Sequence, residues 1–139
     1  MSEASKKLGE LIALGDAFLA RQKIPDSRVA CELLAARLFK CGRLDLFRLL
    51  ETVPGERVVD ALRRGLQRVA KGEPVQYVLG QWDFRSLTLK VDRRALMPRP
   101  ETEQLVDLGL KSAQVKRAAK PLVVDVGTGT GCIILSLAK

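Results

Sequence analysis

Residues 121–138 decide the fold, and they read Pro-Leu-Val-Val-Asp-Val-Gly-Thr-Gly-Thr-Gly-Cys-Ile-Ile-Leu-Ser-Leu-Ala. The run Leu122 to Val124 predicts a short apolar strand, and the apolar run from Cys132 predicts the start of a helix. Between them stands Asp125, followed by glycines at the alternate positions 127, 129 and 131. Glycine tolerates positive φ and has no Cβ, so a ligand can approach the backbone beside the helix start. The stretch therefore predicts a strand, a ligand-binding loop and a helix.

The spacing of the glycines separates the candidate ligands. The dinucleotide fingerprint needs glycine or alanine three residues after the second glycine, where this chain has Cys132. A phosphate loop needs Gly-Lys-Ser or Gly-Lys-Thr, which does not follow here. The pattern D-x-G-x-G-x-G after a β-branched strand resembles motif I of the class I S-adenosylmethionine-dependent methyltransferases. The helix N-terminus would suit the carboxylate of that cofactor. A glycine-rich turn without a ligand is the alternative.

Composition predicts a globular protein without a metal or a disulfide. The 139 residues are 47% hydrophobic and contain no run of 18 apolar residues, and the first seven lack the apolar core of a secretory signal. We therefore expect a cytoplasmic protein that does not contact a membrane. The three cysteines have no C-x-x-C spacing and the chain has no histidine, so neither a disulfide, a zinc site nor a histidine general base is expected.

The net charge of +8 points first to an acidic partner such as nucleic acid. The excess is spread along the chain, however, because residues 1–72 hold 14 Lys and Arg against 9 Asp and Glu, and residues 73–139 hold 10 against 7. The densest basic cluster lies on a predicted helix, where it can equally form the solvated face. It consists of Arg57, Arg63, Arg64, Arg68 and Lys71. Nucleic acid is therefore an alternative partner and not the expected substrate.

Apolar residues recur at helical spacing through the first 70 residues. One stripe runs from Ser5 to Arg21, a second lies between Ser27 and Cys41, and a third runs from Val58 to Val69. A short apolar piece at residues 44–50 separates the second stripe from the third. These stripes predict a small helical bundle, because each helix can bury its apolar face only against the others.

The periodicity changes after Gly72-Glu73-Pro74. A short helix or turn is expected from Val75 to Leu79. Apolar residues then alternate around Arg85-Ser86, which predicts a hairpin whose Trp82 and Phe84 pack into a core. Pro100 and the acidic residues after it predict the start of a further helix, which continues to Ala113.

Four segments carry a resemblance to a known family. They are Gly72-Glu73-Pro74-Val75-Gln76-Tyr77-Val78-Leu79-Gly80, Trp82-Asp83-Phe84, Pro98-Arg99-Pro100-Glu101-Thr102-Glu103 and Asp125-Val126-Gly127-Thr128-Gly129-Thr130-Gly131-Cys132-Ile133. Together they resemble segments in the N-terminal portion of the HemK/PrmC family, the protein-(glutamine-N5) methyltransferases of peptide chain release factors. The glycine loop alone indicates only a methyltransferase, whereas the Pro-Arg-Pro-Glu-Thr-Glu segment is more specific.

The resemblance implies an α plus α/β fold in three parts. Residues 1–73 would form a helical bundle that recognises the substrate, and residues 74–97 a linker with a β-hairpin. Residues 98–139 would begin a class I, Rossmann-like methyltransferase domain that binds S-adenosyl-L-methionine and is truncated after its first strand and glycine loop. The implied partners are class 1 peptide chain release factors, and a monomer is expected.

The resemblance also assigns site residues. Those expected to bind the cofactor are Gly127, Thr128, Gly129, Thr130, Gly131 and Asp125. Asp125 can alternatively make only local turn hydrogen bonds. Arg99, Glu101 and Thr102 are expected along the cleft for cofactor and substrate, with helix capping and a surface pair as the alternative. No metal ligand is expected.

The implied reaction transfers a methyl group to the glutamine nitrogen of a Gly-Gly-Gln motif. An amide nitrogen is a poor nucleophile, so catalysis has to come from orientation and from hydrogen-bond acceptors. In the family an Asn-Pro-Pro-Tyr motif supplies them, and this sequence does not contain it. No catalytic residue is therefore assigned, and the 139 residues alone are expected to be inactive.

Two other functions remain open from the sequence. One is a catalytically inactive helical interaction module that binds a translation factor or RNA. The other is a nucleic-acid adenine methyltransferase with a similar glycine loop, which the segment from Pro98 to Glu103 disfavours.

Overall fold

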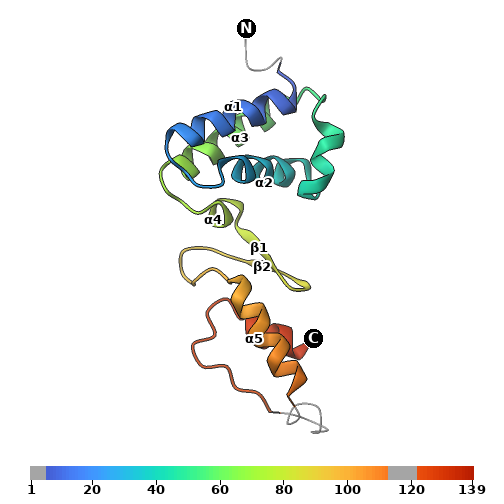
Figure 1. The fold of residues 1–139 in the computed structure, drawn as a ribbon, viewed down its shortest axis with the longest axis vertical. Helices are drawn as coiled ribbons and strands as arrows, with labels where there is room; N and C mark the ends of the chain where they lie inside the picture. Colours follow the sequence, from blue (N-terminus) through green and yellow to red (C-terminus); the bar gives the residue numbers. More distant parts are fainter. Residues whose placement is uncertain (1–5, 113–121) are drawn as a thin grey trace. The chain divides into compact units, whose positions relative to one another are not determined.

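A computed structural model describes residues 6–112 and 122–139. The elements in this part of the chain are α1 (Leu8–Arg21), α2 (Ser27–Phe39), the 3-10 helix η2 (Arg43–Leu49), α3 (Glu56–Ala70), α4 (Val75–Leu79), β1 (Gln81–Phe84), β2 (Leu87–Lys90), α5 (Pro100–Lys111) and α7 (Cys132–Ala138) (Figure 1). They fall into two compact units, residues 1–79 and 80–139. The described chain is therefore mostly helical, with a two-stranded hairpin.

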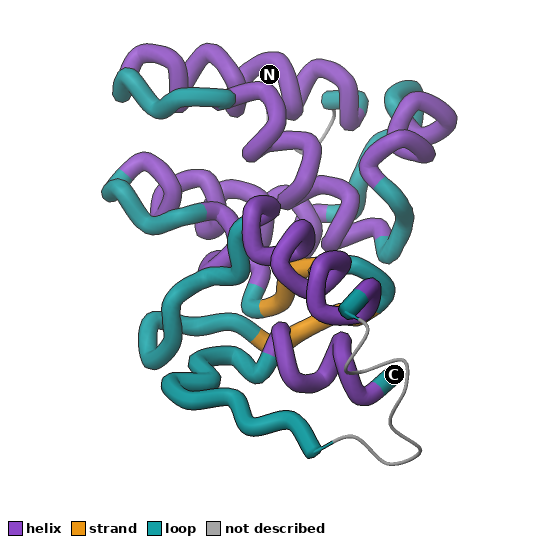
Figure 2. Tube along the Cα trace, turned by 60° about the horizontal axis from the view of Figure 1, so that its bottom comes forward, coloured by secondary structure: helices purple, strands orange, loops and turns teal. Residues whose placement is uncertain are grey.

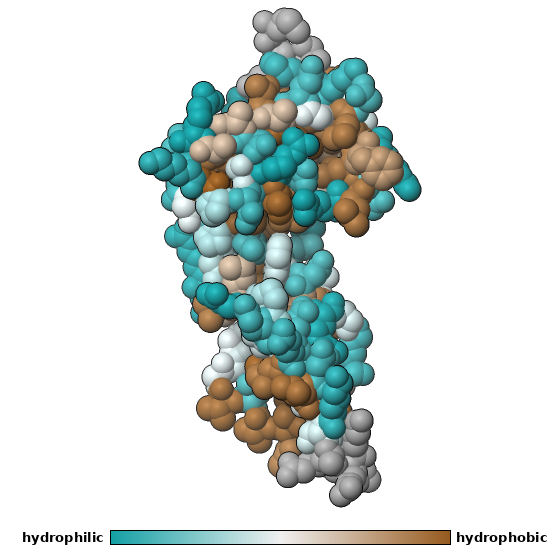
Figure 3. Space-filling model, viewed as in Figure 1, coloured by the Kyte–Doolittle hydropathy of each residue, from teal (hydrophilic) through white to brown (hydrophobic). Residues whose placement is uncertain are grey.

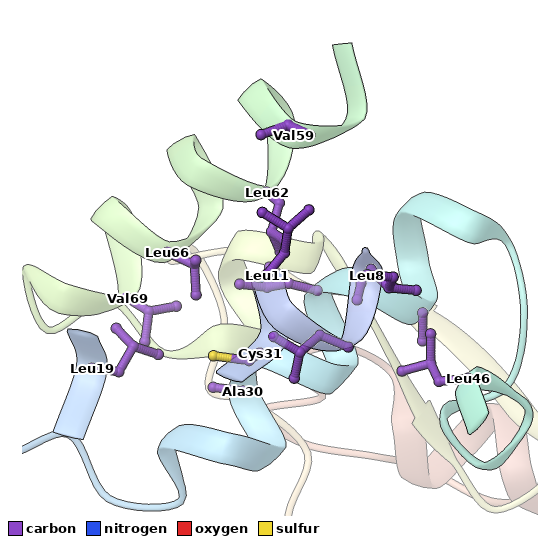
Figure 4. Packing of buried hydrophobic residues seen from close by; sticks show 14 residues of the cluster. Leu8, Leu11, Leu19, Ala30, Cys31, Leu46, Val59, Leu62, Leu66 and Val69 are labelled. Atoms are coloured by element: carbon purple, nitrogen blue, oxygen red, sulfur yellow. The ribbon is translucent and has the colours of Figure 1, made fainter. Parts of the chain in front are cut away.

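Helix α2 is the centre of the N-terminal unit, since it contacts α1, α3, α4 and η2. Side chains from α1, α2, α3 and η2 point toward one another and form one core (Figure 4). Its buried members are Leu8, Leu11, Ile12, Leu19, Ala30, Cys31, Leu34, Ala35, Ala36, Leu46, Val59, Leu62, Leu66 and Val69. The core buries the predicted apolar stripes, so the helical bundle expected from the sequence is confirmed.

A glycine in the buried stripe of α1 lets three helices approach closely. A Cβ atom on Gly15 would lie 2.9 Å from Leu66 Cδ1 and 3.1 Å from Cys31 Sγ, closer than a packed interior allows. The Cys31 thiol at this point is buried, and its burial, reinforced by the nearby Asp16 carboxylate, raises the pKa of Cys31 to about 12. Cys31 is therefore a protonated core residue.

The apolar piece predicted at residues 44–50 is the 3-10 helix η2. Leu46 is buried in the core, and the end of the segment caps α1. The N–H groups of Leu8 and Gly9 donate to the carbonyl oxygens of Thr52 and Leu50 at 2.8 and 2.9 Å. These are N–H groups that a helix cannot pair within itself. The segment therefore completes the start of α1.

In the C-terminal unit, β1 and β2 form an antiparallel pair (Figure 2). Trp82 lies opposite Leu89 and Phe84 opposite Leu87. Phe84 and Leu89 are buried together with Val106 of α5 and Cys132 of α7. The predicted hairpin and the packing role of Phe84 are therefore confirmed, and Trp82 is half-buried.

The helix predicted after Pro100 is α5, which ends at Lys111. The predicted end of that helix at Ala113 lies outside the described residues. So do Ser5, where the first helix was expected to begin, and Pro121, the residue before the predicted apolar strand.

The strand predicted at Leu122 to Val124 is wrong. Residues 122–125 have no regular secondary structure, and among the described residues β1 and β2 pair only with each other. Leu122 and Val124 are 91% and 75% exposed. A strand is held by hydrogen bonds to a neighbour, and a parallel strand is normally covered on both faces. Without such neighbours the apolar run stays uncovered, and no Rossmann-like sheet is evident in the described chain.

Candidate functional site

The loop of residues 125–131 needs its three glycines for its conformation. Gly127, Gly129 and Gly131 have φ of +74°, +57° and +77°, a region that other residues rarely adopt. Among the described residues, a Cβ on Gly127 would meet no atom within 4 Å, and one on Gly129 would meet only the Gly127 carbonyl oxygen at 3.9 Å. The space beside these residues is therefore open, and a ligand can reach the backbone.

Asp125 and Thr128 order this loop. Thr128 Oγ1 donates to Asp125 Oδ2 at 3.0 Å, and the Gly131 N–H donates to the Thr128 carbonyl oxygen at 2.8 Å. Asp125 is half-buried, Thr128 is exposed and Thr130 is half-buried. The first of these hydrogen bonds joins two side chains within the loop. A role for Asp125 toward a cofactor stays a prediction.

Arg99, Glu101 and Thr102 lie at the start of α5. Arg99 has extended backbone angles, Pro100 is the first helical residue, and the Thr102 N–H donates to the Arg99 carbonyl oxygen at 3.0 Å. Arg99 and Glu101 are exposed and Thr102 is half-buried. Their side chains form no hydrogen bond or ion pair with any residue that the structure describes. They are therefore available to a ligand, and the surface pair considered from the sequence is not formed within the described chain.

Packing between α5 and α7 holds the two parts of the candidate site in one unit. A Cβ on Gly109 of α5 would lie 3.3 Å from Leu137 Cδ2 of α7, and Val106 and Cys132 share the core with Phe84. Arg99 precedes α5, and the glycine loop precedes α7. Across residues 6–112 and 122–139, however, no hydrogen bond or ion pair joins the loop to Arg99, Glu101 or Thr102. The described residues thus hold both parts in the same unit without a hydrogen bond or ion pair between them.

The sequence did not predict the role of Glu103. Its Oε1 accepts a hydrogen bond from the Arg85 N–H at 2.9 Å, and the Arg85 guanidinium also pairs with Asp107. Arg85 lies in the hairpin turn with φ of +52°. Glu103 thus ties the first turn of α5 to the hairpin. These partners stand 18 and 22 residues after Arg85, so no local spacing rule could have paired them.

Large apolar side chains are exposed in the unit that holds this site. Leu105 and Leu108 of α5 are 55% and 67% exposed, and Val126 beside the glycine loop is 92% exposed. Figure 3 shows apolar atoms gathered over the C-terminal unit. Exposed apolar surface of this kind marks places where other polypeptide packs.

The described residues contain no group of three His, Cys, Asp or Glu side chains able to hold a metal ion. None of the described helices has the length and apolar character needed to cross a membrane.

Comparison with known proteins identifies the helical unit. The model of the PrmC N-terminal domain matches residues 10–80, which is half of the chain. The chain belongs to this family. The release factor glutamine methyltransferase of Chlorobaculum tepidum is 35% identical over 132 residues, which cover 93% of this chain and 45% of that protein. The enzyme of the same name from Coxiella burnetii is 40% identical over 111 residues, covering 80% of this chain and 39% of the relative.

The similarity also extends to a human protein. The human MTRF1L release factor glutamine methyltransferase is 33% identical over 135 residues, which cover 92% of this chain and 40% of the human protein. The chain thus spans less than half the length of the curated relatives it matches. Because more than nine-tenths of the chain is aligned with the Chlorobaculum and human proteins, the similarity continues beyond the PrmC N-terminal domain into the unit that holds the glycine loop.

Proposed function

We propose that the protein acts in the methylation of the glutamine side-chain nitrogen in the Gly-Gly-Gln motif of class 1 peptide chain release factors. The observation that carries this proposal is the similarity to release factor glutamine methyltransferases over 93% of the chain, which includes both units. In this proposal residues 1–73 recognise the release factor, residues 74–97 link the two parts, and residues 98–139 begin the cofactor-binding domain.

The glycine loop is the proposed binding site for S-adenosyl-L-methionine. The positions of Gly127 and Gly129 leave open space where side chains would otherwise stand, which suits a ligand held against the backbone. Thr128, Thr130 and Gly131 complete this loop, and Asp125 holds it through the Thr128 hydroxyl. When bound, the cofactor supplies an electrophilic methyl group on a sulfonium sulfur. The residues of the loop fit such a ligand because they place little steric bulk around the backbone N–H groups.

Arg99, Glu101 and Thr102 are the proposed cleft residues. Each side chain is without a partner among the described residues and stands at the start of a helix whose core packing fixes its position. Arg99 can hold a carboxylate and Glu101 can accept hydrogen bonds from hydroxyl or amide groups. An amide nitrogen needs such acceptors, since methylation requires its lone pair to be aimed at the methyl group. The sequence has no asparagine, so the Asn-Pro-Pro-Tyr motif cannot come from these 139 residues.

The exposed run from Leu122 to Val126 is proposed to become a strand when parallel neighbours stand beside it. Leu122, Val124 and Val126 are at least 75% exposed, and they are the apolar residues that a buried parallel strand requires. Pairing would give the backbone of residues 122–125 the hydrogen bonds of a sheet, and the helices that cover a parallel sheet would bury the apolar side chains of this run. In this proposal the 139 residues alone hold the loop but do not complete the Rossmann-like domain or its activity.

Cofactor binding is the direct test of the loop. The protein is isolated from its own cells, and the binding of S-adenosyl-L-methionine is measured by calorimetry for the natural sequence and for Gly129→Val. Valine at φ of +57° is strained and fills the open space, so binding should be lost. Gly55→Val is the matched control, because Gly55 has φ of −65° and a Cβ there would meet no atom within 4 Å. Equal binding by both variants would refute the assignment of the loop.

Methyl transfer is the direct test of the activity. The same protein is incubated with a Gly-Gly-Gln peptide and a cofactor that carries a labelled methyl group, with a Gly-Gly-Glu peptide as the control. The label should pass to the glutamine peptide alone. Transfer of the label to DNA or RNA and not to the peptide would favour a nucleic-acid methyltransferase.

A second function is favoured by one feature of the structure. The core of the N-terminal unit contains 14 buried residues, whereas the core of the C-terminal unit contains four among the described residues. A helical module that binds a translation factor without cofactor would need only the first unit. Binding of a release factor that persists without any cofactor binding or methyl transfer would support this alternative.

A further inference from the structure

The N-terminal unit has a groove between α2, α3 and α4, apart from the glycine loop and the cleft residues of the proposed methyl transfer. Its volume is about 390 Å³. Aliphatic side chains of all three helices line it, among them Leu34 and Leu38 of α2 and Val78 and Leu79 of α4. Of the described residues that line it, none is acidic or aromatic. The apolar part of the groove therefore offers a purely aliphatic surface to a partner.

Three arginines line the same groove, Arg37 from α2 and Arg64 and Arg68 from α3. The charge of Arg68 is neutralised within the unit, because its Nε and Nη2 donate to the two carboxylate oxygens of Glu73 at 2.7 and 2.8 Å. Arg37 and Arg64 are exposed, and neither forms an ion pair with a carboxylate of the described residues. Two guanidinium groups on different helices therefore lie beside an apolar surface without an ion-pair partner among the described residues.

We propose that this groove binds an amphipathic helix of a partner protein, one whose apolar stripe is flanked by Asp or Glu. Apolar residues at helical spacing match the aliphatic lining, as in other helix-in-groove interactions. The planar guanidinium groups of Arg37 and Arg64 match carboxylates in a bidentate geometry and would fix the register of the helix. The unbalanced positive charge would also speed the encounter with an acidic partner.

The chemistry of the groove favours a protein partner over nucleic acid. Single-stranded nucleic acids bind to basic grooves in which aromatic side chains stack with the bases. In the part of the chain that the structure describes, no aromatic side chain lines this groove. An aliphatic surface bordered by two arginines matches leucine-type side chains and carboxylates better than bases and phosphates.

Two synthetic helices are the probes for this proposal. The first is a fluorescein-labelled peptide with leucine at every third and fourth position and glutamate on both sides of that stripe. The second has lysine in place of each glutamate. Fluorescence anisotropy with the full chain should show binding of the glutamate helix, weakened by added salt, and no binding of the lysine helix. Absence of binding by the glutamate helix would overturn the proposal.

Charge reversal in the groove is the decisive variant. Arg37→Glu with Arg64→Glu should weaken binding of the glutamate helix by at least about tenfold, because both bidentate contacts become repulsive. The matched control is the double variant Arg21→Glu with Arg57→Glu. It changes the net charge by the same amount, at two exposed arginines outside the groove. The control should leave binding within about twofold, since distant exposed charges are screened by salt.

Two results for these variants would contradict the proposal. An equal loss in both double variants would show that only net charge matters. Binding of polyuridylate that is lost only in the groove variant would make nucleic acid the occupant. All of these measurements concern the N-terminal unit and need no cofactor. A negative result in them would therefore not contradict the proposed methyl transfer, and an absence of methyl transfer would not change how they are interpreted. Circular dichroism checks that each variant keeps its helices.

Discussion

Replacing Gly15 by alanine tests the close packing of α1 in the N-terminal unit. The new Cβ would stand 2.9 Å from Leu66 Cδ1 and 3.1 Å from Cys31 Sγ, so side chains of two helices have to move. Overpacking of this kind costs about 1–3 kcal/mol. Alanine gains about 0.8–1 kcal/mol over glycine in a helix interior, which offsets part of that cost. We expect Gly15→Ala to lower the free energy of unfolding by up to about 2 kcal/mol in total.

Gly9→Ala in the same helix is the matched control. Its Cβ would stand 3.4 Å or more from the nearest atom, the Leu50 carbonyl oxygen, which is ordinary contact. The same exchange should therefore stabilise the unit by up to about 1 kcal/mol.

Urea unfolding followed by the helical circular dichroism signal measures both variants. With a dependence of about 1 kcal/mol per molar urea for a unit of this size, the midpoint for Gly15→Ala should fall by up to about 2 M and that for Gly9→Ala should rise. If Gly15→Ala is as stable as Gly9→Ala, the close approach of α1 to Leu66 and Cys31 is not real.

Two further perturbations test the core thiol and the hairpin. Burial raises the pKa of Cys31 from 9.0 to about 12 in the folded protein, so the unfolded chain loses this proton at a lower pH than the folded protein does. The free energy of unfolding should therefore fall as the pH rises from 9 to 12, by up to about 1.4 kcal/mol per pH unit. Cys31→Ala should remove that part of the slope in urea titrations at several pH values, and an unchanged slope would count against a buried thiol. Glu103→Ala removes the acceptor of the Arg85 N–H and should speed hydrogen exchange of the hairpin amides, measured by NMR, whereas Glu101→Ala should not. Equal exchange in both variants would mean that Glu103 does not hold the turn.

The sequence predicted the elements whose information is local. Helices α1, α2 and α3 follow from apolar stripes that recur every three or four residues, and those stripes fill the observed core. The hairpin follows from alternation on both sides of Arg85-Ser86, and Pro100 marks the first residue of α5. In these elements the pattern that predicts the structure and the contacts that stabilise it lie in the same short segment.

The features that the sequence did not predict depend on distant residues. Leu122 to Val124 have the composition of a strand, but a strand needs partners, and the described chain places none beside them. Glu103 has the position of a helix-start acid, but its contact to Arg85 depends on how α5 meets the hairpin. The groove between α2, α3 and α4 likewise forms only when the three helices pack together. The ion pair between Arg68 and Glu73 also depends on the folded structure, so the sequence could not show which arginines of α3 are paired.

The conformation of the glycine loop agrees with its sequence pattern. The ligand that the loop binds, however, does not follow from this conformation alone. Positive φ at Gly127, Gly129 and Gly131 explains why glycine stands at each position. The proposal that the loop binds S-adenosyl-L-methionine depends on the similarity to release factor glutamine methyltransferases, together with the open space beside the loop.

The methylation state of release factors in the cells that make this protein tests the central proposal most directly. Class 1 release factors are isolated from unmodified cells, from cells without this protein and from cells that carry Gly129→Val, and the Gly-Gly-Gln peptide is analysed by mass spectrometry. We predict one methyl group on the glutamine in unmodified cells and none in the other two. A glutamine that stays methylated without this protein would contradict the proposed function.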